Sequence, residues 1–178
     1  MSNRMIHTKN DLPVKTRRQM VELLDARLAD VMDLYSHAKH AHWNVRGARF
    51  LSLHELFDKV AEMAEGQADE IAERAAQLGG EVHGTMRAGA KATSLREYPL
   101  NIGGVDEHVE AMASSLAAFG KNVREGIDTS DKADDMDTSD MFTDISRAVD
   151  KMLWFVESHQ APQQDGKKMK DHPESSAA

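Results

Sequence analysis

The stretch that decides the fold is LHELFDKVAEMAEGQADEIAERAAQL, residues 53–78. Apolar side chains recur along it every three or four positions, which predicts a long amphipathic helix with one stripe facing a core. The stripe consists of Leu53, Phe57, Val60, Ala64, Ile71, Ala75 and Leu78. Gly79 and Gly80 follow directly and mark the end of the helix.

Four candidate metal ligands occupy a different face of this helix. They form two pairs at i,i+4 spacing, His54 with Asp58 and Asp69 with Glu73. At a rise of about 1.5 Å per residue, Asp58 and Asp69 lie roughly 16 Å apart, so one chain cannot close a single site around both pairs. With successive residues about 100° apart, the pairs point well away from the apolar stripe and out of their own bundle.

A second copy of the chain removes this difficulty. If two such helices run antiparallel about a twofold axis, position 54 lies opposite 73 and position 58 lies opposite 69, so one register completes two sites. Small side chains on the flank of this face would let the partner approach closely; they are Ala61, Ala68 and Ala72. The alternative is a solvated acidic helix face with one incidental histidine. We favour a metal centre between subunits, because symmetry and ligand chemistry agree.

A fifth candidate ligand, His42, lies just before the helix in the run His42-Trp43-Asn44-Val45-Arg46-Gly47. The pattern continues with Phe50, Leu53, His54 and Asp58, then AERAAQLGG at 72–80, Tyr98-Pro99-Leu100, and LWFVE at 153–157. It closely resembles the Dps proteins, the mini-ferritins of starved bacteria. The likeness covers roughly residues 12–158, and the combined spacing is far more specific than any single motif.

The resemblance implies an iron-oxidising centre shared across a subunit twofold. His42, His54 and Asp58 would come from one chain, and Asp69 and Glu73 from its partner. It further implies a homododecameric hollow shell that oxidises Fe2+ to Fe3+, with hydrogen peroxide as the preferred oxidant, and stores the ferric mineral. Each centre would take up to two iron ions, and their removal would protect DNA from oxidative damage.

The residue types also suit this chemistry by themselves. Ferrous iron binds mixed oxygen and nitrogen ligands, and carboxylates stabilise the ferric product. Conventional ferritin-like di-iron proteins use two Glu-x-x-His motifs within one bundle, and this sequence contains none. That difference counts against a conventional ferritin or a di-iron oxygenase and favours a centre between subunits.

The rest of the chain predicts an all-α, ferritin-like four-helix bundle. Helical periodicity indicates helices at about 14–41, 48–78, 105–126 and 139–158. The long connection at 79–104 predicts a crossover between two parallel helices, with a short helix starting at the capping box Ser94-Leu95-Arg96-Glu97. We expect a bundle at 14–160, a flexible N-terminal tail at 1–13 and a disordered C-terminal tail at 161–178.

Composition indicates a soluble cytoplasmic protein. The 178 residues suffice for one domain with a substantial core, and they include no cysteine. No apolar stretch approaches the length of a membrane span and no N-terminal leader is evident, so we expect no membrane partner. The formal net charge of −8 opposes a generally basic surface for nucleic acid.

DNA binding and nucleoid association therefore depend on the N-terminal tail, which is modestly basic. Its candidate DNA contacts are Arg4, Lys9, Lys15, Arg17 and Arg18. The main rival to iron storage is a nucleoid-structuring DNA-binding protein with a weak or vestigial iron site. A more distant rival is a helical scaffold without metal.

Aspartates are dense between positions 128 and 144. Carboxylates at a helix start complement the helix dipole and cap its first turn, which is one explanation. The other comes from the resemblance, which implies that Asp140 and Asp144 line a threefold pore for incoming iron. Rings of carboxylates would concentrate ferrous ions there.

Several neighbouring residues have two interpretations. Trp43 is a candidate radical trap beside the iron, or a residue packed at a helix end. Lys39 lies one turn before His42, and we expect it to face solvent rather than pair with a site carboxylate. The other histidines lack partners at ligand spacing and are expected to be surface or capping residues; these are His37, His40, His83, His108 and His159.

Overall fold

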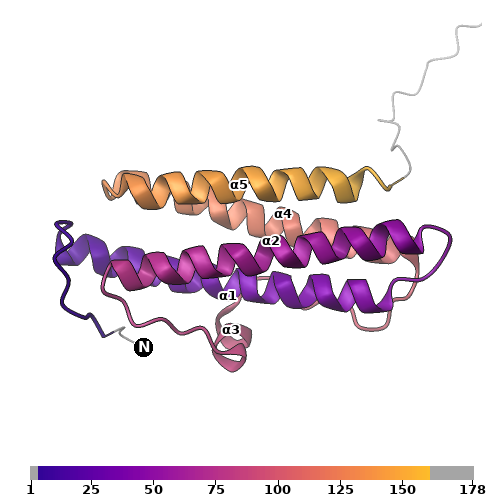
Figure 1. Ribbon diagram of the computed structural model, residues 1–178, viewed down its shortest axis with the longest axis horizontal. Helices are drawn as coiled ribbons and strands as arrows, with labels where there is room; N and C mark the ends of the chain where they lie inside the picture. Colours follow the sequence, from indigo (N-terminus) through magenta and orange to yellow (C-terminus); the bar gives the residue numbers. More distant parts are fainter. Residues whose placement is uncertain (1–3, 161–178) are drawn as a thin grey trace, which may run out of the picture.

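The computed structural model describes residues 4–160 and folds them into five helices. Four long helices lie side by side: α1 (Val14–Asn44), α2 (Phe50–Gln77), α4 (Val105–Lys132) and α5 (Met136–Glu157). The short helix α3 (Met86–Ala92) lies beside α1, away from α5 (Figure 1). The predicted all-α four-helix bundle is confirmed.

The helix boundaries differ from the expected ones mainly in α4 and α5. α4 continues to Lys132 and α5 begins at Met136, so only a tight turn separates them. Asp134 in this turn has a positive φ of 58°, a conformation that aspartate tolerates better than most residues. The aspartates at 131 and 134–135 therefore form the end of α4 and this turn, not a loop before a helix that begins at about residue 139.

The two glycines after α2 are both required by the structure. Gly79 has a φ of 85°, in the left-handed region. A Cβ atom at Gly80 would lie 2.5 Å from Cγ1 of Val21, so a side chain there would collide with α1. The predicted stop after Leu78 is confirmed.

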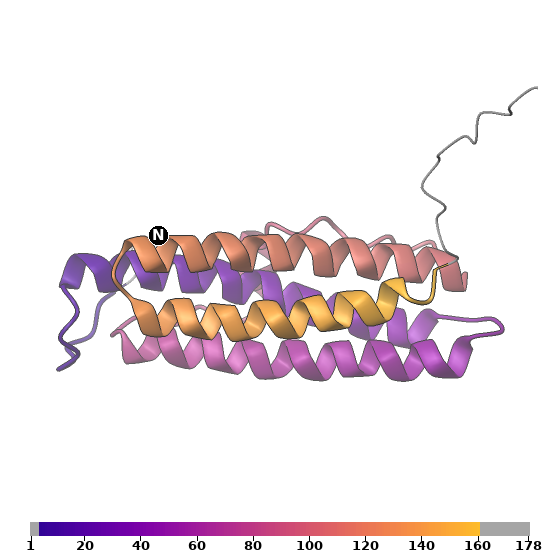
Figure 2. The ribbon, with the colours of Figure 1, turned by 90° about the horizontal axis from the view of Figure 1, so that it is seen from above.

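The connection at 79–104 runs along the bundle, and α2 and α4 are parallel (Figure 2). The expected crossover is confirmed, but its short helix was misplaced. α3 is capped by the Thr85 side chain, which accepts a hydrogen bond from the Ala88 amide. The Ser94 amide and hydroxyl instead donate to Asp30 Oδ1 at 2.7 and 2.9 Å. Because Asp30 is fully buried on α1, this contact ties an extended segment to the bundle.

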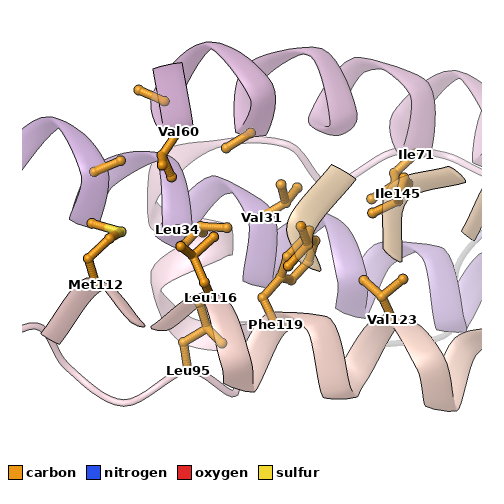
Figure 3. Packing of buried hydrophobic residues seen from close by; sticks show 14 of the residues in the cluster. Val31, Leu34, Val60, Ile71, Leu95, Met112, Leu116, Phe119, Val123 and Ile145 are labelled. Carbon is orange, nitrogen blue, oxygen red and sulfur yellow. The ribbon is translucent and has the colours of Figure 1, made fainter. Parts of the chain in front are cut away.

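The core lies between the four long helices, and Leu95 and Tyr98 of the crossover also contribute to it (Figure 3). Every member of the predicted apolar stripe of α2 is buried. Residues labelled in Figure 3 show the mixed origin of the core: Val31 and Leu34, Val60 and Ile71, Leu95, Leu116 and Phe119, and Ile145. Ala61 belongs to this core as well, so its expected place on the flank of the outer face was wrong.

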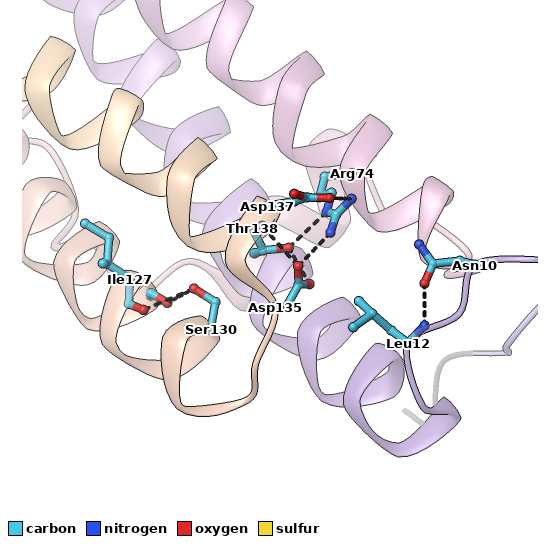
Figure 4. A network of polar contacts seen from close by, with 9 residues as sticks. Asn10, Leu12, Arg74, Ile127, Ser130, Asp135, Asp137 and Thr138 are labelled. Carbon is cyan, nitrogen blue, oxygen red and sulfur yellow. Dashed lines mark hydrogen bonds and ion pairs between the residues drawn. The ribbon is translucent and has the colours of Figure 1, made fainter.

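A polar network joins the end of α2 to the start of α5 (Figure 4). Arg74 donates to Asp135 Oδ1 at 2.7 Å and to Thr138 Oγ1 at 2.9 Å. Asp135, 2% exposed, also accepts the Thr138 amide and so caps α5. For this aspartate, the capping explanation of the acidic run is confirmed.

The N-terminal segment makes defined contacts with the end of α2. The Ile6 amide donates to the Gly79 carbonyl at 2.7 Å. Arg17 is buried and donates to the carbonyls of Leu12 and Leu78. The expected C-terminal tail at 161–178 lies outside the described residues. Within residues 4–160, no helix combines the length and apolar character needed to cross a membrane.

Candidate metal centre

His42, near the end of α1, and His54, in the first turns of α2, form a stacked pair. Their ring centroids are 3.7 Å apart and their planes are 20° from parallel. His42 Nδ1 lies 2.7 Å from the His54 carbonyl oxygen, and His54 Nδ1 lies 2.8 Å from the His42 carbonyl oxygen. The two residues therefore hold each other in place across the α1–α2 junction.

This reciprocal contact settles which ring nitrogen carries the proton. A carbonyl oxygen can only accept, so Nδ1 of each ring must be the N–H donor. In a neutral imidazole, the other nitrogen, Nε2, then has a free lone pair. Hydrogen bonding of one ring nitrogen to a carbonyl is the usual way in which proteins orient a metal-binding histidine.

Asp58 lies beside this pair, one helical turn after His54. Its Oδ1 is 2.5 Å from Lys39 Nζ and 3.8 Å from His42 Nδ1. The hydrogen bond from Lys39 lowers the pKa of the Asp58 carboxyl below its usual value, and burial opposes part of this effect. The group is thus a carboxylate at neutral pH. The expectation that Lys39 faces solvent was wrong, because packing of α1 on α2 brings it to this carboxylate.

Asp69 and Glu73 are exposed further along α2, on the turns away from the histidines. The structure therefore brings together three of the five predicted ligands and leaves the other two apart. Within residues 4–160, no three histidine or carboxylate groups converge tightly enough to hold an ion. The two predicted groups of ligands therefore lie apart within one chain, as the spacing predicts.

Apolar side chains surround the histidine pair without being covered by this chain. Trp43 is 68% exposed and Leu51 is 64% exposed. The Phe50 ring lies 5.0 Å from the His54 ring. Trp43 is therefore not packed at a helix end within its own chain. The Nζ atom of Lys39 lies 5.8 Å from the centroid of the Trp43 ring.

The remaining predicted site residues lie away from this pair. Asp140 and Asp144 are exposed on α5, and Asp144 is paired with Arg147. Arg4, Lys9 and Lys15 are exposed. Arg17 holds the end of α2 through its buried guanidinium, so we withdraw it from the candidate DNA contacts. Arg18 is partly buried.

A cluster that spacing alone did not reveal lies under the crossover. His37 and His108 are buried, which contradicts the expected surface position, and the Tyr98 ring packs against both and against His40. Burial lowers the pKa of His37 and of His108. These residues come from α1, the crossover and α4, so only the tertiary fold brings them together. By contrast, His83 is exposed, as expected.

The comparisons with known proteins agree with this architecture. The family model described as a ferritin-like domain matches residues 21–162. The DNA protection during starvation protein of Agrobacterium fabrum is 40% identical over 152 residues, covering 85% of this chain and 94% of that protein. Its counterpart from Mycolicibacterium smegmatis is 32% identical over 147 residues, covering 82% of this chain and 79% of that protein.

Solved structures give the same result. Dps from Mycobacterium smegmatis in its tetragonal form matches with a TM-score of 0.82 at 31% identity, covering 86% of this chain and 93% of that one. Dps from Microbacterium arborescens in its high iron form matches with a TM-score of 0.77 at 28% identity, covering 88% and 98%. The shared fold and sequence show that this chain belongs to the Dps family of ferritin-like proteins.

Proposed function

We propose that this protein is a ferroxidase and iron-storage mini-ferritin, which oxidises Fe2+ with hydrogen peroxide and retains the ferric product. The observation that carries the proposal is the His42–His54 pair, whose hydrogen bonds leave both Nε2 lone pairs free, with an ionised carboxylate 3.8 Å from His42 Nδ1. Iron here is the substrate. Consumption of ferrous iron and peroxide would protect DNA, the role named for the relative from Agrobacterium fabrum.

The complete centre is proposed to lie between two subunits. His42, His54 and Asp58 of one chain would bind iron together with Asp69 and Glu73 of the partner subunit, giving the nitrogen and oxygen ligands that iron accepts. Support comes from α2, which is one continuous helix over Phe50–Gln77 and so preserves the antiparallel register. The exposed apolar residues beside the histidines are suited to burial by a partner.

We further propose that such dimers assemble into the hollow dodecamer that the Dps resemblance implies. The exposed Asp140 and Asp144 would line its threefold pore and attract ferrous ions. Replacement of both by asparagine should slow iron uptake, measured by stopped-flow absorbance, while light scattering still gives the mass of twelve chains. Unchanged uptake would remove these residues from the pore.

DNA binding is the second candidate function, favoured by the names of the relatives and by the exposed Arg4, Lys9 and Lys15. The net charge of −8 opposes it, so many weak N-terminal contacts per shell would be needed. We expect retardation of DNA at low salt that disappears when residues 1–12 are deleted. Absence of retardation at low salt would leave iron storage as the whole function.

The ferroxidase proposal is tested by adding hydrogen peroxide to the anaerobic protein loaded with Fe2+, and following ferric absorbance. We expect His54→Ala and Asp69→Ala each to abolish the fast, peroxide-dependent phase. His83→Ala and Glu70→Gln are the matched controls, because both positions are exposed and lie outside the proposed ligand set. Equal rates in all four variants would refute the proposed centre.

A further inference from the structure

Tyr98 in the crossover and His108 in the first turn of α4 form a buried hydrogen-bonded pair that the ligand set does not include. We propose that Tyr98 is an electron donor to the iron chemistry, and that His108 accepts the phenolic proton when Tyr98 is oxidised. This inference rests on the proposed oxidation of ferrous iron by peroxide, and it adds a redox residue to that reaction.

The position of the pair suits electron transfer to the metal centre. The Tyr98 hydroxyl lies 3.0 Å from His108 Nδ1. The Tyr98 ring centroid is 5.4 Å from that of His40, which precedes the candidate ligand His42 by two residues on α1. Side chains two residues apart point to nearly opposite sides of a helix, so α1 itself separates the Tyr98 ring from the ligand His42, and the electron would cross one helix width of about 10 Å.

The protonation states also suit the proposed step. Burial lowers the pKa of His108 and His40 lowers it further, whereas Glu107 and the Ile102 backbone raise it. His108 is therefore neutral at neutral pH and can accept a hydrogen bond at Nδ1. Burial raises the pKa of Tyr98, so the phenol keeps its proton until it is oxidised.

The direction of this hydrogen bond follows from the surroundings of the phenol. If His108 Nδ1 were the donor, the Tyr98 proton would have no acceptor among residues 4–160. A buried hydroxyl without an acceptor costs free energy, so Tyr98 is the donor and His108 Nδ1 the acceptor. The proton thus already points at the atom that would receive it.

The step balances at a centre that holds a single ferrous ion. Peroxide takes one electron from Fe2+ and yields Fe3+, hydroxide and a hydroxyl radical. The radical takes the second electron from Tyr98 and becomes hydroxide, while the phenolic proton passes to His108 Nδ1. The next Fe2+ reduces the phenoxyl radical, becomes Fe3+, and the proton returns from His108. In total, two Fe2+ and one H2O2 give two Fe3+ and two hydroxide ions.

A purely packing role explains the cluster less well. Phenylalanine would fill the Tyr98 position without a hydroxyl that needs a buried partner. Burial of polar rings carries a desolvation cost, and the Nε2 atom of His40 has no hydrogen-bond partner among residues 4–160. An electron donor that prevents escape of the hydroxyl radical would account for retaining these groups.

The test uses the assembled full-length protein with Trp43→Phe, so that no radical forms on this exposed indole. Each chain receives one Fe2+ under anaerobic conditions, then one equivalent of H2O2, and the sample is frozen rapidly for electron paramagnetic resonance. We expect a tyrosyl signal that narrows when the protein contains ring-deuterated tyrosine. Tyr98→Phe should lose this signal, and spin-trapped hydroxyl radical in solution should rise several-fold.

Tyr35→Phe is the matched control, since Tyr35 is the other tyrosine of the chain. It should keep the signal. His108→Gln should lower the radical yield, because a neutral amide cannot take up the proton. This variant still tests the inference if Tyr98→Phe folds poorly. An unchanged signal in Tyr98→Phe, or ferric iron without any tyrosyl signal in the Trp43→Phe parent, would overturn the inference. Absence of ferric iron in the wild type would instead overturn the proposed function, and this inference with it.

Discussion

The Asp58 carboxylate and the two Nε2 atoms differ in their readiness to bind a metal ion. The imidazole lone pairs are free, whereas Asp58 is already paired with Lys39. The sequence spacing alone predicts His54 and Asp58, because i,i+4 spacing is a local property of a helix, whereas His42 was predicted only through the Dps resemblance. The pairing with Lys39 could not be predicted, because it depends on how α1 packs against α2.

Replacement of Lys39 by methionine should tighten metal binding. The incoming ion would no longer compete with the ammonium group, although the pKa of Asp58 would rise toward its usual value. Ion pairs as exposed as this one contribute about 0–1 kcal/mol, so we expect at most about a fivefold gain in affinity. Isothermal titration calorimetry with Zn2+, which has no redox chemistry, measures this gain in metal affinity. Weaker binding in Lys39→Met would show that the lysine assists the site.

The buried histidines should make stability depend on pH. The pKa of His108 is lowered in the folded protein, so the unfolded chain binds a proton that the folded chain does not. The free energy of unfolding should therefore be highest above about pH 6.5, the usual histidine pKa, and fall as the pH drops below it. Urea unfolding at about pH 7.5 and about pH 5.5 should show a smaller difference for His108→Gln than for the wild type. The exposed control His83→Gln should not reduce that difference.

At the scale of helices, periodicity predicted all four long helices. The prediction that was wrong is the position of the short helix, which was based on a capping signal. Ser94 has the sequence of a helix cap, yet its polar groups bind Asp30 on α1. Thr85 caps the short helix in its place. A capping signal is local, whereas the choice between two caps depends on which polar partner the folded bundle offers.

Loss of the Asp135 carboxylate should uncouple α5 from α2. Asp135→Ala removes the cap of α5 and leaves the guanidinium of Arg74 without its buried partner. Breaking such a pair costs about 3–5 kcal/mol of the free energy of unfolding. Asp135→Asn retains a capping side chain and should cost less. Urea denaturation measures both.

The neighbouring Asp137 provides the control for this prediction. It lies 3.7 Å from the same arginine but is 86% exposed. Exposed substitutions usually change stability by no more than about 0.5 kcal/mol, which is the effect expected for Asp137→Ala. Equal losses at the two positions would show that burial does not govern this network.

At the scale of the whole molecule, the α2 residues that do not pack against their own chain face outward. Asp69 and Glu73 are exposed, and a Cβ atom at Gly66 would meet nothing within 4 Å. Glycine within a helix costs about 0.5–1 kcal/mol relative to alanine, so packing within one chain does not account for it. Close approach of a second helix in the proposed dimer would account for it. The sequence predicts this twofold arrangement because antiparallel symmetry converts a linear spacing into paired positions.

Two inactive variants should restore each other if the centre is shared. One chain carries His54→Ala with Asp58→Ala, and the other carries Asp69→Ala with Glu73→Ala. Each alone lacks half of every centre, but a mixed dimer contains one centre with all its ligands. With random pairing about half of the dimers are mixed, so co-expression should recover about one quarter of the wild-type peroxide-dependent rate. Separate affinity tags on the two chains verify that mixed assemblies form. Mixed assemblies without recovered activity would mean that each chain builds its iron site from its own residues.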